Sequence, residues 1–247
     1  KWKKFLNLMT RRGVEATIIG QFTSSGKCFE KYGPRVILDL SLEFLHNGLP
    51  KRHLRTKAFK KTNPEPKIPK QSGLTDSLLS LLSRLNIASF EFISAQYDHE
   101  VQGSSVLKPL QGRGRVNSET SAVRPVLNSA KGIVLSQGLY PADSDIDTYH
   151  MAAASIDTAI RNVVAAGGDP DDIALLDNFC WYSPDVSESL WQLKRACRAC
   201  YDYSIAFGTP FISGKDSMYN DFAGFDHEGK PVKISIPPTL LISSIGV

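Results

Sequence analysis

The sequence predicts an α/β domain that spans about residues 74 to 247, with a β-rich segment before it. Apolar residues recur at helical spacing within residues 75–86, 147–166 and 184–206. Short apolar runs that suit buried strands separate these stretches. Near the C-terminal end, a strand, a long helix and a second strand follow one another, which is the usual order of a parallel strand pair. We therefore expect a mixed sheet with helices packed on it.

The first 50 residues have strand-like patterns at 16–19 and 35–40, with turn residues at 24–26 and 33–34. A segment this short buries little core alone, so we expect residues 1–50 to be the tail of a neighbouring domain. Residues 51–73 are rich in Lys, Pro and Thr and predict a linker. The chain begins with Lys1 and stops inside an apolar stretch, so we expect a fragment of a longer protein.

Each predicted helix of the 74–247 domain has terminal signals of its own. These are Thr75 and Asp76 before the first helix, Asp147 before and 167–168 after the second, and Ser183–Pro184 before and Gly208 after the third. The apolar runs predict strands at 133–135, 173–176, 211–212 and 239–247.

The charge distribution is uneven along the chain. The net charge is +4, yet residues 1–70 alone hold 16 Lys and Arg against 5 Asp and Glu. A basic segment of this kind can hold nucleic acid or a phosphorylated ligand. The segment carries no aromatic interleaving of the kind that binds single-stranded nucleic acid, and its densest part, residues 51–70, contains three prolines. A solvated linker is therefore the interpretation we favour, and nucleic-acid binding is the alternative.

Four cysteines and the absence of a signal-peptide pattern favour reduced thiols in the cytoplasm, and no run is long and apolar enough for a membrane span. The spacing of Cys197 and Cys200 is typical of redox or zinc motifs. The pair falls within the third predicted helix, without a second pair or a histidine at ligand spacing. We therefore interpret both as residues of the helix face.

Two candidate sites follow apolar strands, where α/β proteins place their ligands. One is the stretch 175–181, which contains Asp177, and the other is the loop 213–217. In that loop Gly214 would let the backbone approach a ligand, Lys215 offers a charge for phosphate, Asp216 offers a hard oxygen for Mg²⁺, and Ser217 offers a hydroxyl. The spacing of a Walker A loop is absent, and a plain turn is the alternative.

Two weaker candidates lie earlier in the chain. Ser155, Thr158 and Asn162 form a polar stripe on the helix predicted at 147–166, and Glu119 is a lone carboxylate before an apolar run. Simple solvent exposure is the alternative for both.

Several motifs resemble the phosphoribosylformylglycinamidine synthase family, and they occur here in the family's order. They are Gln96-Tyr97-Asp98-His99-Glu100-Val101-Gln102-Gly103, residues 112–117, 144–147, 156–162 and 175–181, and Gly208-Thr209-Pro210-Phe211-Ile212-Ser213-Gly214-Lys215-Asp216-Ser217. The resemblance covers nearly the whole chain. It implies an AIR-synthase-like N-terminal domain at 74–247 and, in the complete protein, two similar halves that face each other.

The family resemblance implies a reaction that uses ATP and Mg²⁺ to convert formylglycinamide ribonucleotide to an amidine in purine biosynthesis. By position, Asp177, Gly214, Lys215 and Ser217 resemble nucleotide- or substrate-contacting residues, and Glu119, Asn162 and Asp216 match Mg²⁺ positions. The chain departs from the family in three places. Thr158 stands where many members have glutamate, Glu119 replaces an aspartate, and Lys215 stands where some members have asparagine.

The resemblance also shows what this chain lacks. It has no His-Asn-His-Pro motif, which carries the family's catalytic histidine, and no nucleophile elbow surrounds Cys180. His99 and His150 are more simply interpreted as structural residues. We therefore expect a fragment that is inactive alone and that pairs with the rest of the synthetase or with a second copy, with a glutaminase supplying ammonia. The alternative is a nucleotide-holding scaffold that supports a catalytic half.

Overall fold

The computed structural model describes residues 1–60, 62–69, 73–96, 103–113 and 115–247. The chain divides into two units, Lys1–His53 and Leu54–Val247. The domain boundaries expected from the sequence, at residues 50 and 73, remain predictions.

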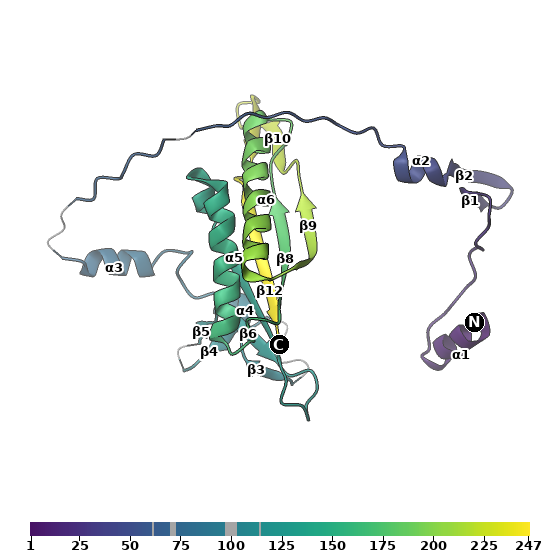
Figure 1. The fold of residues 1–247 in the computed structure, drawn as a ribbon, viewed down its shortest axis with the longest axis horizontal. Coiled ribbons are helices and arrows are strands. Elements are labelled where there is room, and N and C mark those ends of the chain that lie inside the picture. The colour runs from purple at the N-terminus through teal and green to yellow at the C-terminus, as the bar shows by residue number, and fades with distance from the viewer. Residues whose placement is uncertain (61, 70–72, 97–102, 114) are drawn as a thin grey trace. The chain divides into compact units, whose positions relative to one another are not determined.

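The first unit consists of two helices and one hairpin: α1 (Trp2–Arg11), β1 (Lys27–Tyr32), β2 (Arg35–Ser41) and α2 (Leu42–Asn47) (Figure 1). Strands β1 and β2 pair antiparallel around the turn at Gly33, whose φ of +57° suits glycine. The Ser41 side chain caps α2 by accepting from the amide of Phe44. None of the residues in these four elements is buried. This agrees with the expectation that so short a segment has no core of its own.

Two sequence predictions in this unit need correction. Residues 16–19 form no strand, because no neighbouring segment of the unit pairs with their backbone. The helix α1 was not predicted, although Trp2, Phe5 and Met9 recur at helical spacing. Strand β2 was predicted correctly.

The second unit is built on one mixed sheet of six strands in the order β3-β6-β7-β12-β8-β9. These strands are β3 (Ser105–Leu107), β6 (Thr120–Val123), β7 (Ile133–Leu139), β8 (Ile173–Cys180), β9 (Phe211–Ser217) and β12 (Thr239–Gly246). Strand β12 pairs antiparallel with both β7 and β8, whereas β8 and β9 are parallel. The mixed α/β architecture is therefore the one that the sequence predicts.

The remaining elements connect or flank this sheet. They are α3 (Thr75–Leu82), α4 (Glu91–Ser94), the hairpin of β4 (Leu110–Gln111) and β5 (Val116–Asn117), the 3₁₀ helix η1 (Pro141–Asp145), α5 (Thr148–Ala165), α6 (Ser187–Phe207), and the hairpin of β10 (Asp221–Phe225) and β11 (Pro231–Ser235). The described part of 51–73 contains neither helix nor strand, as a linker would. None of the described helices combines the length and the apolar character that a bilayer span requires.

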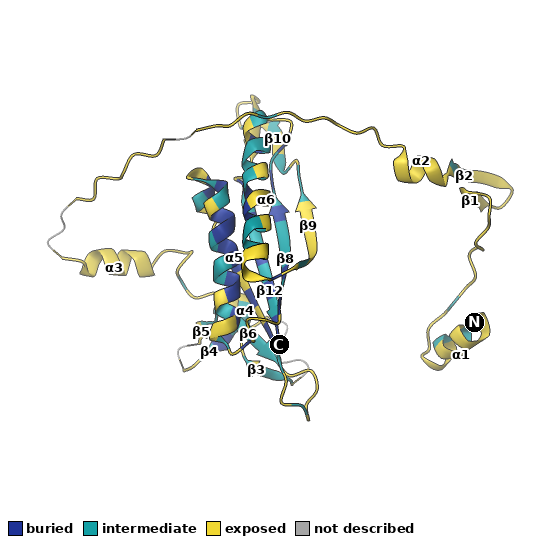
Figure 2. Ribbon diagram, in the orientation of Figure 1, coloured by how far each residue is buried: buried dark blue, intermediate teal, exposed yellow. Residues whose placement is uncertain are grey.

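Helices α5 and α6 lie side by side against one face of the sheet (Figure 1). Alternate residues of β12, namely Leu240, Ile242 and Ser244, are fully buried, because strand side chains alternate between faces. They pack against small and branched residues of α5, and Ala196 and Ala199 of α6 complete the core. Buried residues concentrate in these elements (Figure 2). On the opposite face, Leu135 and Leu139 of β7 remain about half exposed.

Local signals explain where the long helices begin and end. Asp147 caps α5 as predicted, because its side chain accepts from the amides of Tyr149 and His150. Gly208 ends α6 with a left-handed φ of +70°, also as predicted. The predicted N-cap at Ser183 is wrong, because α6 starts at Ser187 after an extended Val186. The predicted caps Thr75 and Asp76 lie inside α3 itself.

Candidate functional site

The two sequence-predicted sites meet on the parallel strands β8 and β9. Asp177 pairs with Gly214, and Phe179 pairs with Asp216. The sequence predicted strands at 173–176 and 211–212 with the sites in the stretches that leave them, whereas the strands continue through Cys180 and Ser217. The turn-forming residues of 213–217 adopt an extended conformation because the backbone of β8 pairs with them. The predicted convergence of Asp177 and Asp216 is confirmed, since they lie on neighbouring strands, two positions apart in the register and on the same face.

Asp177 and Asp216 lie on the face of the sheet that α6 covers. Asp177 lies between Leu175 and Phe179 in the alternation of β8, and both of these residues are in the core. Its carboxylate lies directly over Gly214, where an added Cβ would be 2.1 Å from Oδ1. Burial and the negative charge of Asp216 raise the pKa of Asp177, against a hydrogen bond from the Lys215 amide. Gly214 is therefore required for close contact with a partly buried carboxylate.

Lys215 and Ser217 lie on the opposite, helix-free face of these strands. Lys215 pairs with Asn178, and Ser217 pairs with Cys180. Paired residues of parallel strands point to the same side, so these four side chains share one face. The predicted site residues are thus divided between two faces of the sheet. A ligand that contacts Lys215 and Ser217 at the strand ends can therefore contact only the backbone atoms of Gly214.

A second group of predicted residues lines a cavity of about 820 Å³ beside the end of β7. Strand β6 is short, so the last residues of β7 lack a neighbour there, and Glu119 enters this space directly before β6. Thr158 of α5 lines the same cavity, and its hydroxyl is 2.9 Å from the Tyr140 hydroxyl. A cavity of this size suits a small-molecule ligand.

Two other polar residues that line this cavity are already paired. Arg115 forms an ion pair with Glu91, and the side chain of Asn117 bonds Ser94 and the amide of Phe90. Glu119 thus remains as the carboxylate that no cation of the described chain neutralises. An unpaired carboxylate attracts a cation or a hydrogen-bond donor rather than a phosphate oxygen.

The three predicted Mg²⁺ positions do not share one place. Asn162 lies one helical turn beyond Thr158 on the same side of α5, and so belongs near the cavity of Glu119. Asp216 belongs to β9, four strands across the sheet from β6 and about 19 Å away at ordinary strand spacing. One ion cannot bridge that span. Among the described residues, no three His, Cys, Asp or Glu side chains converge as an all-protein metal site would need.

Comparison with known proteins finds several to which this chain is similar. Residues 118–236 match the model of the AIR synthase related protein, N-terminal domain. The chain is 28% identical to the phosphoribosylformylglycinamidine synthase subunit PurL of Thermoplasma volcanium, over 99% of this chain and 31% of that protein. It is 33% identical to PurL of Methanothermobacter marburgensis, over 94% of this chain and 30% of that protein. The chain is similar to these PurL proteins over nearly all of its length. It spans about a third of the length of the PurL proteins it matches.

Solved PurL structures share the fold. Thermotoga maritima PurL complexed with ATP superposes with a TM-score of 0.62 at 18% identity, over 99% of this chain and 35% of that chain. T. maritima PurL complexed with FGAR gives a TM-score of 0.57 at 19% identity, over 90% and 31%. Together with the match to the AIR synthase related domain at residues 118–236, these superpositions confirm the AIR-synthase-like fold expected from the sequence motifs.

Cys197 and Cys200 behave as packing residues of α6. Burial raises the pKa of Cys197, and it raises the pKa of Cys200 to about 12, with the charges of nearby groups acting in the same direction. Both remain protonated at neutral pH, which favours the helix-face interpretation over redox or metal chemistry. His150 is exposed on α5 with its ring edge against Tyr149, and His99 lies outside the described residues.

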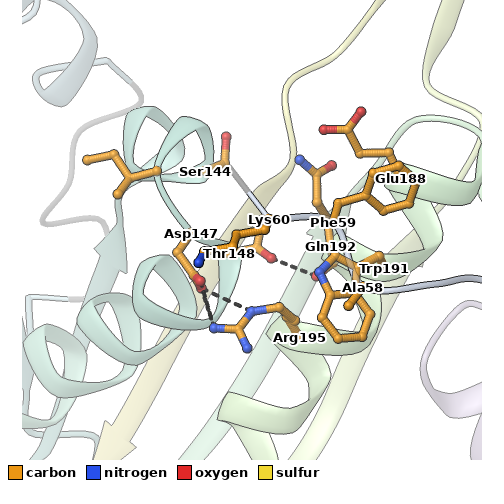
Figure 3. A pocket seen from close by; sticks show the side chains of 11 residues that line it. Ala58, Phe59, Lys60, Ser144, Asp147, Thr148, Glu188, Trp191, Gln192 and Arg195 are labelled. Atoms are coloured by element: carbon orange, nitrogen blue, oxygen red, sulfur yellow. Dashed lines mark hydrogen bonds and ion pairs between the residues drawn. The ribbon is translucent and has the colours of Figure 1, made fainter. Parts of the chain in front are cut away.

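A smaller cavity of about 260 Å³ lies where α5 begins, next to α6 (Figure 3). Arg195 donates two hydrogen bonds from Nη2 to the Asp147 carboxylate, at 2.6 and 2.8 Å, and Thr148 donates to the carbonyl of Gln192. Partial burial acts to raise the pKa of Asp147, but the bonds from Arg195 and from two backbone amides outweigh it and lower that pKa. The sequence identified Asp147 as a cap but gave no signal for its pairing with Arg195. This ion pair fixes α6 to the start of α5.

Proposed function

We propose that this chain is a segment of an ATP-dependent phosphoribosylformylglycinamidine synthase and contributes a nucleotide-binding surface to it. The observation that supports this most is the similarity to PurL along 99% of the chain, joined to the shared fold. In T. maritima, PurL has been solved complexed with ATP, ADP and FGAR. The complete enzyme would convert formylglycinamide ribonucleotide to the amidine in purine biosynthesis in the cytoplasm.

The chemistry explains why such a surface is needed. An amide oxygen is a poor leaving group until ATP phosphorylates it, after which ammonia displaces it as phosphate. The protein's part is to hold the phosphates and to stabilise the charge that develops on them. Here Lys215 would meet the phosphate as a point charge, and the bare backbone of Gly214 would allow a close approach beside Asp177.

Magnesium would bind with the phosphates rather than in a protein cage. Mg²⁺ usually keeps several waters and takes only one or two carboxylates together with substrate phosphates. We propose Glu119 and Asn162 as ligands on one side of the sheet and Asp216 as a separate ligand at the other. Among the described residues no cation pairs with Glu119, which supports its part of this assignment.

The partners of the chain follow from what it lacks. It contains no His-Asn-His-Pro motif and no glutaminase elbow. We therefore propose that it works with the rest of a synthetase chain or with a second copy, and that a glutaminase supplies ammonia. No observation in the structure favours nucleic acid.

The proposal is tested by turnover and binding measured on the same preparation. The isolated chain should make no amidine above a buffer control when supplied with formylglycinamide ribonucleotide, ATP, Mg²⁺ and ammonia. It should nevertheless bind ATP, and Lys215→Ala should weaken that binding about tenfold through loss of a charge-assisted contact. The matched control is Lys131→Ala, because Lys131 is an exposed lysine at the opposite end of the sheet. Turnover that Asp177→Ala abolishes would show that the fragment is active after all.

One observation favours a scaffold as the second candidate. Thr158 carries no charge, and its hydroxyl is within hydrogen-bond distance of the Tyr140 hydroxyl, so Glu119 is the one carboxylate among the described residues that line the cavity. A site weakened in this way could hold a nucleotide without turning it over. Nucleotide that copurifies with the longer protein and is not hydrolysed would favour the scaffold over the enzyme.

A further inference from the structure

One side chain, Asn220, ties together the ends of the two strands that carry the candidate site. Its Nδ2 donates to the carbonyl oxygens of Trp181 at 3.0 Å and Ser217 at 2.6 Å. The backbone amide of Asn220 also donates to the Trp181 carbonyl, and the backbone amide of Trp181 donates to the Ser217 carbonyl. Trp181 is fully buried, and its indole Nε1 donates to the carbonyl of Ser189 on α6. The Asn220 side chain is therefore anchored to the core.

These contacts fix which way the Asn220 amide points. Carbonyl oxygens only accept hydrogen bonds, so the NH₂ group must face Trp181 and Ser217. The amide oxygen Oδ1 is then turned to the Ser217 hydroxyl, 3.2 Å away. Because Oδ1 can only accept, the Ser217 hydroxyl must donate its proton to it. The hydroxyl thus presents only lone pairs to anything else that approaches.

The turn that places Asn220 is itself constrained. Tyr219 has a φ of +60°, a backbone conformation that non-glycine residues rarely adopt. Its hydroxyl donates to the carboxylate of Asp185 at 3.3 Å, which secures the turn against the segment before α6. Such strain persists only where surrounding contacts enforce it, and it recurs at ligand sites.

We infer that Asn220 is a positioning residue that makes the Ser217 hydroxyl an obligate acceptor. This part of the site therefore takes Mg²⁺ or a ligand N–H or O–H group, and not a phosphate oxygen. The inference rests on the proposed function, because it requires a nucleotide at the ends of β8 and β9. Lys215, on the same face, remains the group that meets phosphate.

The first test compares two ligands that differ in what they offer to Ser217. MgATP carries a metal ion and donor groups, whereas tripolyphosphate in EDTA at pH 8 offers only phosphate oxygens. We expect Ser217→Ala to weaken MgATP binding about fivefold, as loss of one hydrogen bond would, and to change tripolyphosphate affinity less than twofold. Ser217→Thr, which keeps the hydroxyl, should restore MgATP affinity. An equal loss for both ligands, or no loss for either, overturns the inference.

The second test is a double-mutant cycle on Asn220, with MgATP affinity as the readout. If Asn220 orients the hydroxyl, Ser217→Ala should cost much less in the Asn220→Ala background than in the unchanged chain. An Asn220 with a purely structural role would leave the cost the same in both backgrounds, which would contradict the inference. Melting curves identify variants that fail to fold. If an Asn220 variant does not fold, the comparison of MgATP with tripolyphosphate decides whether the inference stands. Failure of the unchanged chain to bind MgATP would overturn the proposed function too, whereas additive losses would overturn only the role of Asn220.

Discussion

Gly138 of β7 leaves no room for a side chain against the backbone of α5, so Gly138→Ala is a sharp test of the described packing. A Cβ added there would lie 2.0 Å from the carbonyl oxygen of Ser155 and 2.8 Å from its carbonyl carbon. An ordinary contact needs more than 3 Å, and both obstructing atoms are backbone, so the helix would have to move by about 1 Å. The fully buried Ser155 hydroxyl, 3.4 Å from the carbonyl of Leu240, would move with it.

We expect this substitution to lower the free energy of unfolding by about 3 kcal/mol, the upper end of ordinary overpacking costs. For a unit of this size, the loss corresponds to a decrease of roughly 6–12 °C in Tm. Thermal unfolding followed by circular dichroism measures it. Gly73→Ala is the control, because a Cβ there meets nothing within 4 Å, and it should change stability by less than about 0.5 kcal/mol. A Gly138→Ala variant as stable as this control would show that α5 does not pack on β7 as described.

Two further predictions concern titrating groups. The pKa of Asp177 is raised in the fold, so its protonated form is the one that the folded chain favours. The stability that this form contributes is full below the ordinary pKa of about 3.9 and is lost as pH rises through the pKa of the folded state. Asp177→Asn should therefore raise Tm at pH 7 and have little effect near pH 3, and an equal effect at both pH values would contradict this reasoning. The pKa of Asp147 is lowered, so its contribution is present above the ordinary pKa and is lost as pH falls through the folded value. Arg195→Met should cost about 1–3 kcal/mol at pH 7, with the deficit shrinking toward pH 2, and a pH-independent deficit would show that the ion pair is not its source.

The sequence predicted the regular elements well where a local signal existed. The helix expected at 147–166 is observed at Thr148–Ala165, because an aspartate cap and a diglycine bound its apolar pattern. Strands β7, β8 and β9 were predicted only in their apolar parts, at 133–135, 173–176 and 211–212, whereas β12 was predicted over its whole length. Residues 213–217 were predicted as a loop because Gly, Asp and Ser favour turns, and the pairing with β8 that overrides this preference is a tertiary contact.

The candidate site was predictable as a set of residues but not as an arrangement. From the strand-helix-strand order, the sequence correctly predicted that Asp177 and Asp216 lie near each other. Once 213–217 is a strand, alternation places Lys215 and Asp216 on opposite faces, which a loop would not require. Glu119 and Thr158 share a cavity because β6 ends early, a detail of register that short-range patterns do not encode. The role of Asn220 depends on three hydrogen-bond partners that only the folded chain brings together.

A crystal structure of the chain soaked with ATP and Mg²⁺ tests the central claim most directly. The account predicts triphosphate density at the ends of β8 and β9, on the face that carries Lys215 and Ser217. Nucleotide density confined to the cavity that Asp147 and Arg195 line would contradict it. Well-diffracting crystals that contain no nucleotide at saturating concentration would contradict it too.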